Sequence, residues 1–342
     1  MNLTAIDAIE RRLAGADARL GVLSRVKNEC DVIEAFVRHH LTLVDRVVVV
    51  DNGSQDGTRE ILDALVAEGL QLSVLADDTI EYRQGEIMTY LARASIRAFE
   101  FDRLFLLDAD EFLHVGSRAE LDATLALFYD EDHLRMPWTT YVPDGDDEVG
   151  APPLTIRKRR RAERAPTFKV AIAGSFVLQP ATTVAMGSHT VLESGVAIET
   201  PIARELRVAH YPVRSLAQLR TKSALAWTSY VAMGYDGGGF AEHWRQLSVG
   251  FASGEPVRLR DEAFGYPGEA VAFHEDELVE DPLPFGCTLR YLDLAIPDPS
   301  RTIARFAEQM ARRYAELRAM LDVIRPELGA LEGRLSALEA KP

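Results

Sequence analysis

The 342-residue chain has little cysteine, no long apolar run and fewer basic than acidic residues. Two cysteines, Cys30 and Cys287, are too few for a disulfide framework or a four-cysteine zinc site. No stretch approaches the ~18 consecutive apolar residues of a membrane-spanning helix. The 38 Lys and Arg against 53 Asp and Glu give a net charge of −15, and nucleic-acid binding needs clustered cations. These absences predict a globular protein with free thiols in a reducing compartment and no nucleic-acid partner.

Motifs of several nucleotide-binding classes are also missing. No G-x-G-x-x-G follows the first expected strand, and the chain contains no Gly-Lys pair, so dehydrogenase and P-loop motifs are absent. Position 112 is Phe, where a D-x-D-x-[TV] phosphatase has Thr or Val. A nucleotidyltransferase would carry a glycine-rich loop at residues 24–29, which here read SRVKNE. That class nevertheless remains a less favoured alternative.

The N-terminal residues lack the continuous apolar core of a secretory signal. Leu3, Ile6, Ile9 and Leu13 instead fall on one side of a helical projection. We therefore expect an amphipathic helix within residues 1–19 and a location in the cytoplasm.

The next ~100 residues alternate strand-like and helix-like patterns. Strands are expected at residues 20–26, 46–50, 70–75 and 103–107, with helices at 32–43, 59–67 and 85–99. Continuous apolar runs separated by helices are typical of a parallel α/β sheet buried on both faces. Ligands of such sheets bind at the carboxyl ends of the strands. This rule selects the loops that begin at Asp51 and Asp108.

The rest of the chain has a different pattern. Residues 134–213 hold short strand-like pieces without a long helix, and residues 215–234 are expected to be helical. We divide the main α/β domain, residues 20–240, into halves at 20–115 and 116–240. An irregular segment, 241–299, and C-terminal helices, 300–342, follow.

The C-terminal helices carry an apolar stripe. From Ile303 to Leu338 apolar residues recur at steps of 3 and 4, which is a heptad pattern. Pro326 and two later glycines predict that one helix stops near Arg325 and a weaker one follows. The stripe leaves two uses open, packing on the chain's own domain or pairing with a second copy in a homodimer.

Three carboxylates, Asp108, Asp110 and Glu111, follow a buried strand directly. Positions i and i+2 of a strand face the same side, so Asp108 and Asp110 can approach one cation, with Glu111 to the side. Carboxylates so close repel one another unless a cation lies between them, and hard ions such as Mg²⁺ and Mn²⁺ suit them. A solvated strand end is the alternative for this pattern.

A second polar loop, residues 51–58 (DNGSQDGT), follows the strand 46–50. Asp51 ends that strand, and Gly53 permits the chain to reverse. A carboxylate here can accept from a base N–H or a ribose hydroxyl, and a well-capped turn is the alternative.

Three motifs together resemble those of family 2 glycosyltransferases with the GT-A fold. They are Lys27-Asn28-Glu29, residues 49–58 and residues 107–113 (LDADEFL). More narrowly they resemble a bacterial subgroup that shares its pattern with family 92 enzymes. Later signals follow that subgroup's order: Trp138, Phe168-Lys169, Pro180, His189, His210-Tyr211, Ser215 and Lys222. The resemblance covers residues 20–234.

The resemblance implies a GT-A domain: a Rossmann-like α/β unit with a mostly parallel central sheet and flanking helices, here with a helical C-terminal extension. Residues 20–115 would bind the nucleotide and residues 116–240 the acceptor. It implies a nucleotide diphosphate-sugar donor, with a UDP-sugar favoured, and a divalent cofactor, Mn²⁺ or Mg²⁺. Expected donor contacts are Lys27, Asn28, Glu29, Asp51, Arg83, Gln84, Asp108 and Lys222. Expected metal ligands are Asp108 and Asp110, with His210 or His189 as a third.

The catalytic base and the acceptor are less defined. Inversion at the sugar needs a carboxylate that takes a proton from the acceptor hydroxyl. The chain departs from the subgroup at residues 143–148 (PDGDDE), where Asp146 is the candidate base and a solvated loop is the alternative. The basic run 157–164 suggests an anionic or lipid-linked glycan acceptor and association with the inner face of the cell membrane. A catalytically silent, glycan-binding scaffold is the alternative function.

Overall fold

The structure is a computed structural model that describes residues 18–77, 84–145, 154–234, 242–268 and 273–339. The chain divides into two compact units, Met1–Pro299 and Ser300–Pro342. The two units are described separately below.

A ten-stranded sheet forms the first unit, with its main path in the order β13-β7-β6-β8-β4-β1-β2-β3. Strands β3, β2, β1 and β4 are parallel, and β8 joins β4 antiparallel. A separate three-stranded sheet has the order β11-β10-β9. The strands are β1 (Leu20–Val26), β2 (Arg46–Asp51), β3 (Leu72–Ala76), β4 (Arg103–Leu106), β5 (Glu111–His114), β6 (His133–Val142), β7 (Lys158–Arg160), β8 (Phe168–Ala173), β9 (Thr182–Val184), β10 (Val191–Glu193), β11 (Val196–Ala197), β12 (Arg207–His210) and β13 (Leu278–Glu280).

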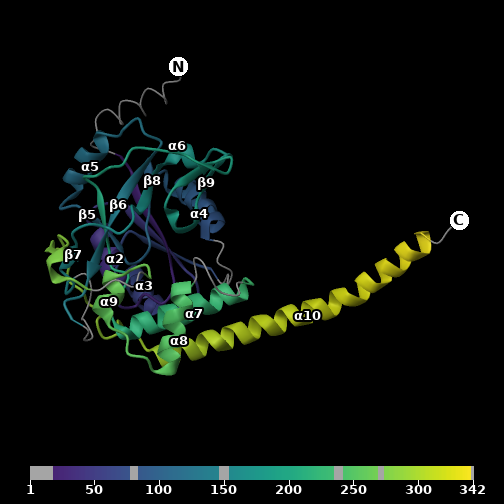
Figure 1. Cartoon of the computed structure of the whole chain (residues 1–342). Coiled ribbons are helices and arrows are strands. Elements are labelled where there is room, and N and C mark those ends of the chain that lie inside the picture. The colour runs from purple at the N-terminus through teal and green to yellow at the C-terminus, as the bar shows by residue number, and fades with distance from the viewer. Residues whose placement is uncertain (1–17, 78–83, 146–153, 235–241, 269–272, 340–342) are drawn as a thin grey trace, which may run out of the picture. The chain divides into compact units, whose positions relative to one another are not determined.

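Helices cover both faces of the parallel strands (Figure 1). The helices are α2 (Ile33–His40), α3 (Thr58–Ala67), α4 (Gln84–Phe99), α5 (Arg118–Ala126), α6 (Gly174–Val177), α7 (Leu216–Ala232), α8 (Glu242–Ser253), α9 (Leu259–Phe264) and α10 (Pro299–Glu339). Alternate residues of a strand face opposite sides. Val47 of β2 therefore packs towards α2 and α3, and Val48 packs towards α4. Both helix layers are held by this alternation of apolar side chains.

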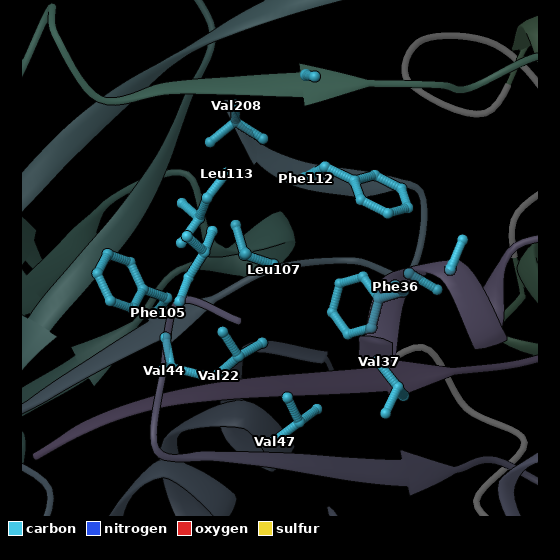
Figure 2. Packing of buried hydrophobic residues seen from close by; sticks show 14 of the residues in the cluster. Val22, Phe36, Val37, Val44, Val47, Phe105, Leu107, Phe112, Leu113 and Val208 are labelled. Carbon is cyan, nitrogen blue, oxygen red and sulfur yellow. The ribbon is translucent and has the colours of Figure 1, made fainter. Parts of the chain in front are cut away.

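The core on the α2 side joins distant parts of the chain (Figure 2). Phe36 of α2, Phe105 of β4 and Phe112 of β5 are fully buried there, as is Val208 of β12. The rings of Phe36 and Phe112 meet edge to face at 6.0 Å between centroids. The chain directly after the Asp108 loop is therefore fixed against the main core.

Strand β12 returns to the carboxylate loop. It pairs antiparallel with β5, and His210 lies opposite Glu111 in that register. It also pairs parallel with β6, where His210 lies opposite Thr140. Sheet pairing therefore places the histidine beside the acidic motif, 99 positions earlier in the sequence (210 − 111).

The α/β architecture expected from the GT-A resemblance is confirmed, including the parallel strands, the helices on both faces and a helical C-terminus. The expected irregular character of residues 241–299 is wrong, since they contain α8, α9 and β13. Trp244 of α8 is buried, and Leu247 and Phe251 pack in the same cluster at helical spacing. The N-terminal helix was expected within residues 1–19; residues 1–17 lie outside the described residues, and residues 18 and 19 are not helical.

The second unit is the single helix α10 rather than two helices. It continues through Pro326, where we expected a break. A proline removes one backbone hydrogen bond and introduces a clash, but good helix formers on both sides maintain the other bonds of this 41-residue helix. None of the described helices is long and apolar enough to cross a membrane.

Gly174, the first residue of α6, packs closely against the segment that precedes β4. A Cβ at this position would lie 2.2 Å from the carbonyl oxygen of Phe101. Gly174→Ala should therefore lower the free energy of unfolding by ~1–3 kcal/mol, the typical cost of overpacking, measured by chemical denaturation. Gly250→Ala in α8 is the control, because its nearest neighbour would be 3.5 Å away. Equal stability of the two variants would contradict the packing described.

Candidate active site

The turn after β1 is held to the loop after β2 by hydrogen bonds. The backbone N–H of Asn28 donates to Ser54 Oγ at 2.9 Å, and that of Glu29 donates to Thr58 Oγ1 at 2.8 Å. The Asn28 side chain accepts in return from the backbone N–H of Gln55 at 2.7 Å. Asn28 has a φ of +57°, a left-handed conformation that asparagine tolerates better than most residues. The two loops therefore form one rigid edge of the site.

Asp51 lies at this edge, at the end of β2. It is buried, and its Oδ1 accepts from the backbone N–H of Ser54 at 3.0 Å. The Lys27 ammonium donates to the backbone oxygen of Asn52 at 3.0 Å. Burial, followed by the nearby Arg25 charge, lowers the pKa of Lys27 to about 8. The structure therefore places Lys27, Asn28 and Asp51 at the same edge.

Asp108 and Glu111 share a cation. The fully buried Lys169 ammonium of β8 donates to Asp108 Oδ2 at 2.6 Å and to the carbonyl of Gly187 at 2.7 Å. It lies 3.2 Å from Glu111 Oε2, which also accepts from the backbone N–H of Asp108 at 2.8 Å. Lysine is rarely buried without such partners. Lys169 thus joins the first and third acids of the motif.

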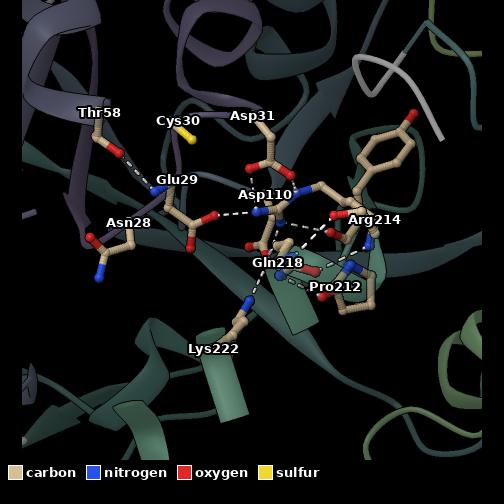
Figure 3. A network of polar contacts seen from close by, with 12 residues as sticks. Asn28, Glu29, Cys30, Asp31, Thr58, Asp110, Pro212, Arg214, Gln218 and Lys222 are labelled. Carbon is tan, nitrogen blue, oxygen red and sulfur yellow. Dashed lines mark hydrogen bonds and ion pairs between the residues drawn. The ribbon is translucent and has the colours of Figure 1, made fainter. Parts of the chain in front are cut away.

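Asp110 is bound by different cations (Figure 3). Its Oδ2 accepts from the Lys222 ammonium of α7 at 2.7 Å and from Arg214 Nη1 at 3.4 Å. The buried Arg214 also contacts both oxygens of Asp31, at 2.8 and 3.0 Å, and donates to Glu29. One guanidinium therefore joins the turn after β1 to the carboxylate motif after β4.

The acids of the site differ in their pKa values, because burial and the nearby cations act on each to a different extent. It raises the pKa of Glu111 to about 8 and that of Glu29 to about 7, against the opposing effects of Lys169 and Arg214 respectively. Burial would also raise the pKa of Asp110, but Lys222, His210 and Arg214 hold it below its usual range. Burial lowers the pKa of His210 to about 3, so this imidazole is neutral. A neutral imidazole can coordinate a metal ion.

One corner of the site suits a divalent cation. Ligand atoms of Asp110, Glu111 and His210 all lie within 4.8 Å of one another. Glu111 Oε1 and His210 Nδ1 are buried and have no hydrogen-bond partner within the described residues. Two carboxylates and an imidazole are a donor set that Mn²⁺ accepts readily. The residues present therefore fit a divalent ion.

The other expected site residues lie apart from the group Asp110, Glu111 and His210, called the metal corner below, or outside the described residues. His189 lies outside the metal corner, with Nδ1 2.9 Å from the carbonyl oxygen of Phe168. Asp108 is bonded to Lys169 and is also outside that corner. Arg83 and Asp146 lie outside the described residues, and only the backbone of Gln84, the first residue of α4, is described.

The sequence analysis gave no role to Lys169, Arg214 or Asp31. It predicted that Asp108 and Asp110, rather than Glu111, would bind the cation. A signal existed for Lys169, because it is the one charged residue in the apolar strand FKVAIA. A buried lysine implies an acidic partner. The only sequence signal for Arg214 is its position four residues after His210. No neighbouring residue indicates the three acids that it contacts.

Residues 22–149 match the family model described as "Glycosyl transferase family 2". This part of the chain, 128 of 342 residues (149 − 22 + 1), is therefore similar to family 2 glycosyltransferase domains. The match covers the three N-terminal motifs. Lys169, His210, Arg214 and Lys222, which complete the charge cluster, lie beyond it. No curated protein sequence matches the chain.

Solved glycosyltransferase structures resemble the chain at low identity. Staphylococcus aureus TarS (residues 1–349) is 14% identical, with 73% of this chain and 72% of that chain covered and a TM-score of 0.34. The Pyrobaculum calidifontis mannosyltransferase PcManGT, in complex with GDP-Man and Mn²⁺, is 14% identical over 72% and 75%, with a TM-score of 0.35. Mycobacterium tuberculosis glucosyl-3-phosphoglycerate synthase is 19% identical over 38% and 48%, with a TM-score of 0.26. Scores this low assign no substrate or residue role to this chain.

The Lys169 cluster gives a stability prediction. Lys169→Met leaves the buried Glu111 without the ammonium that it contacts and should destabilise the protein by ~1–3 kcal/mol, the usual cost of leaving a buried polar group without its partner. Adding Glu111→Gln replaces the acid that has lost this partner, so the double variant should recover part of that loss. Chemical denaturation of the two single variants and the double variant measures the coupling. Strictly additive losses would show that Lys169 and Glu111 do not stabilise one another.

Proposed function

We propose that the protein transfers a sugar from a nucleotide diphosphate donor, with a UDP-sugar favoured, in a metal-dependent and inverting reaction. The observation that carries the proposal is the buried cluster of Asp110, Glu111 and His210 beside the strand ends that hold Asp51 and Asp108. The cluster lies at the carboxyl ends of parallel strands, where α/β proteins bind their ligands. The family 2 match of residues 22–149 supports the same chemistry.

The donor nucleotide would lie along the edge formed by the turn after β1 and the loop after β2. Asp51 would accept from the base or ribose. Asn28 would contribute its amide Nδ2, a buried donor without a partner in the described part of the chain. Glu29 lies in the same turn but is bonded to Arg214, so we assign it to holding the turn in place.

A divalent ion would be held by Asp110, Glu111 and His210, and when bound it would neutralise charge on the leaving diphosphate. Lys222 would add a second positive charge at the same place, because its ammonium already lies 2.7 Å from Asp110. Fixed charges of this kind stabilise the anion that develops in the transition state. Arg214 and Lys169 would hold the carboxylates in position.

The proposed acceptor is a glycan, either free or lipid-linked. Asp146 stays the proposed base and lies outside the described residues. The basic run is not a free positive surface, since most of its cations pair with carboxylates: Arg157 with Glu280, Lys158 with Asp144 and Glu275, Arg159 with Asp281, Arg160 with Glu163, and Arg164 with Glu277. Arg161 instead donates to the backbone carbonyl of Asp276. This pairing weakens the case for membrane association through that run. A cytoplasmic location is proposed from the cysteine usage.

A glycan-binding scaffold without catalysis is the rival function. The intact carboxylates and their cation partners argue against it, because buried charges are costly to maintain without use. Release of nucleotide diphosphate from sugar nucleotides with Mn²⁺ separates the two, since a scaffold would show no turnover.

Calorimetry tests the donor site directly. UDP should bind the wild type more tightly with Mn²⁺ than with EDTA. Asp110→Asn should abolish that difference while leaving the metal-free affinity, because the residue contacts the ion rather than the nucleotide. Asp51→Ala should weaken binding by ~1–3 kcal/mol in both buffers, the cost of an unsatisfied donor.

Sugar transfer by the Asp110→Asn and Asp51→Ala variants is then measured as turnover of the donor. Asp110→Asn should lower turnover about a hundredfold or more, the scale of losing one preorganised charge. Wild-type protein that binds none of UDP, GDP and dTDP with Mn²⁺ would overturn the proposed function. Full turnover in EDTA would overturn its metal dependence.

We also propose that α10 pairs with a second copy of the chain. Tyr314, Leu317, Leu321 and Ile324 are 45–68% exposed and follow one another at steps of 3 and 4. Such a stripe is typical of a coiled-coil seam. Exposed apolar surface of this extent calls for cover from water.

One substitution on the stripe and one beside it test the dimer. Leu321→Asp should convert the dimer to a monomer, because it buries a charge in the seam. Val323→Asp is the matched control, since Val323 is 68% exposed but lies off the stripe. Light scattering with size exclusion gives the masses. A wild type that is monomeric at micromolar concentration would end the dimer hypothesis.

A further inference from the structure

A pocket of about 260 Å³ lies beside Trp138. It is lined by Pro137, Trp138, Glu163, Pro166, Thr167, Phe168, Ile202 and Arg204. All of these residues belong to the described part of the first unit. Pockets for drug-sized ligands measure ~300–1,000 Å³, so this one suits a smaller group.

The pocket shares a wall with the carboxylate site. The Trp138 ring stacks on the His210 ring at 4.1 Å between centroids and meets His189 edge to face at 5.3 Å. His210 is in turn a member of the metal corner with Asp110 and Glu111. Trp138 therefore connects the pocket with the proposed site of sugar transfer.

The walls are mostly apolar and flat. Pro137, Pro166 and Phe168 contribute rings, and Arg135 is fixed near Phe168, 5.1 Å from its ring centroid. Ring surfaces of this kind contact the C–H faces of a ligand without hydrogen bonds. Ligand pockets commonly combine such walls with a few polar groups that fix orientation.

Glu163 is one of those polar groups. Its Oε1 accepts from the backbone N–H of Thr140 at 2.6 Å, and its Oε2 accepts from Thr140 Oγ1 at 2.9 Å and from Arg160 at 3.2 Å. A carboxylate has about four acceptor positions, so one remains on Oε1. The side chain is 18% exposed. Glu163 is therefore a fixed acceptor that can still take one hydrogen bond from a ligand hydroxyl.

Arg204 is the second polar group. It is exposed at the pocket and makes no hydrogen bond or ion pair within the described residues. Most cations of the run 157–164 discussed above are by contrast paired with acids. Arg204 thus offers unused donors beside a fixed acceptor, which together suit the hydroxyl and ring oxygens of a carbohydrate.

We propose that this pocket binds one sugar ring of the acceptor. The apolar walls take the C–H face of the ring, Glu163 accepts from one hydroxyl, and Arg204 donates to ring or hydroxyl oxygens. The assignment rests on the proposed function for calling the ligand an acceptor. The carbohydrate site itself stands on the pocket alone.

Saturation-transfer NMR with the full-length protein tests the site. The probes are the methyl glycosides of glucose, galactose, mannose and N-acetylglucosamine at millimolar concentration. At least one should bind the wild type. Glu163→Gln and Arg204→Ala should each weaken that binding about fivefold to tenfold, the effect of losing one hydrogen bond. Glu205→Gln, an exposed neighbour that does not line the pocket, should leave it unchanged.

Two results would overturn the site: no glycoside binds the wild type, or all three variants bind as the wild type does. Calorimetry with UDP and Mn²⁺ on Arg204→Ala separates this inference from the proposed function. UDP binding equal to wild type with glycoside binding lost supports the pocket. Glycoside binding without any nucleotide binding would keep the carbohydrate site and remove the transferase function.

Discussion

The structure depends on the neutralisation of carboxylates that the parallel strands bring to one buried edge. Asp110 is almost inaccessible to water, so its charge cannot be solvated. An unpaired ion in such a place costs several kcal/mol. Lys169, Arg214 and Lys222 supply the compensating charges, and each is fully or largely buried with its partners. The cluster therefore exists only when the whole first unit is folded.

The charge cluster links the two halves of the first unit, one of which supplies the acids and the other the cations. The acids come from the parallel α/β half and the turn after β1. The cations come from β8, from the segment after β12 and from α7, all in the second half. Strand β12 provides the connection, because its register with β5 sets His210 opposite Glu111. A change in that register would separate the histidine from the acids and leave several buried charges unpaired at once.

The same geometry relates the two binding regions. Trp138 on β6 both stacks on His210 and lines the proposed carbohydrate pocket. Since β6 pairs with both β8 and β12, the Lys169 strand and the His210 strand are fixed by one neighbour. Donor chemistry and acceptor recognition would thus rest on adjacent strands of a single sheet, where relative positions vary little.

The sequence by itself determined the local elements and the positions of the acids. The strands and helices from residue 20 to 107 agree with the expected ranges within a few residues, because apolar periodicity is a local property. Asp51, Asp108 and Asp110 were placed at strand ends for the same reason. The sequence could not determine the pairing of charges: Lys169 is 61 positions from Asp108, and Arg214 is 185 from Glu29. Strand register and burial, which only the tertiary structure sets, decide which cation meets which acid and place Glu111, rather than Asp108, together with Asp110 and His210.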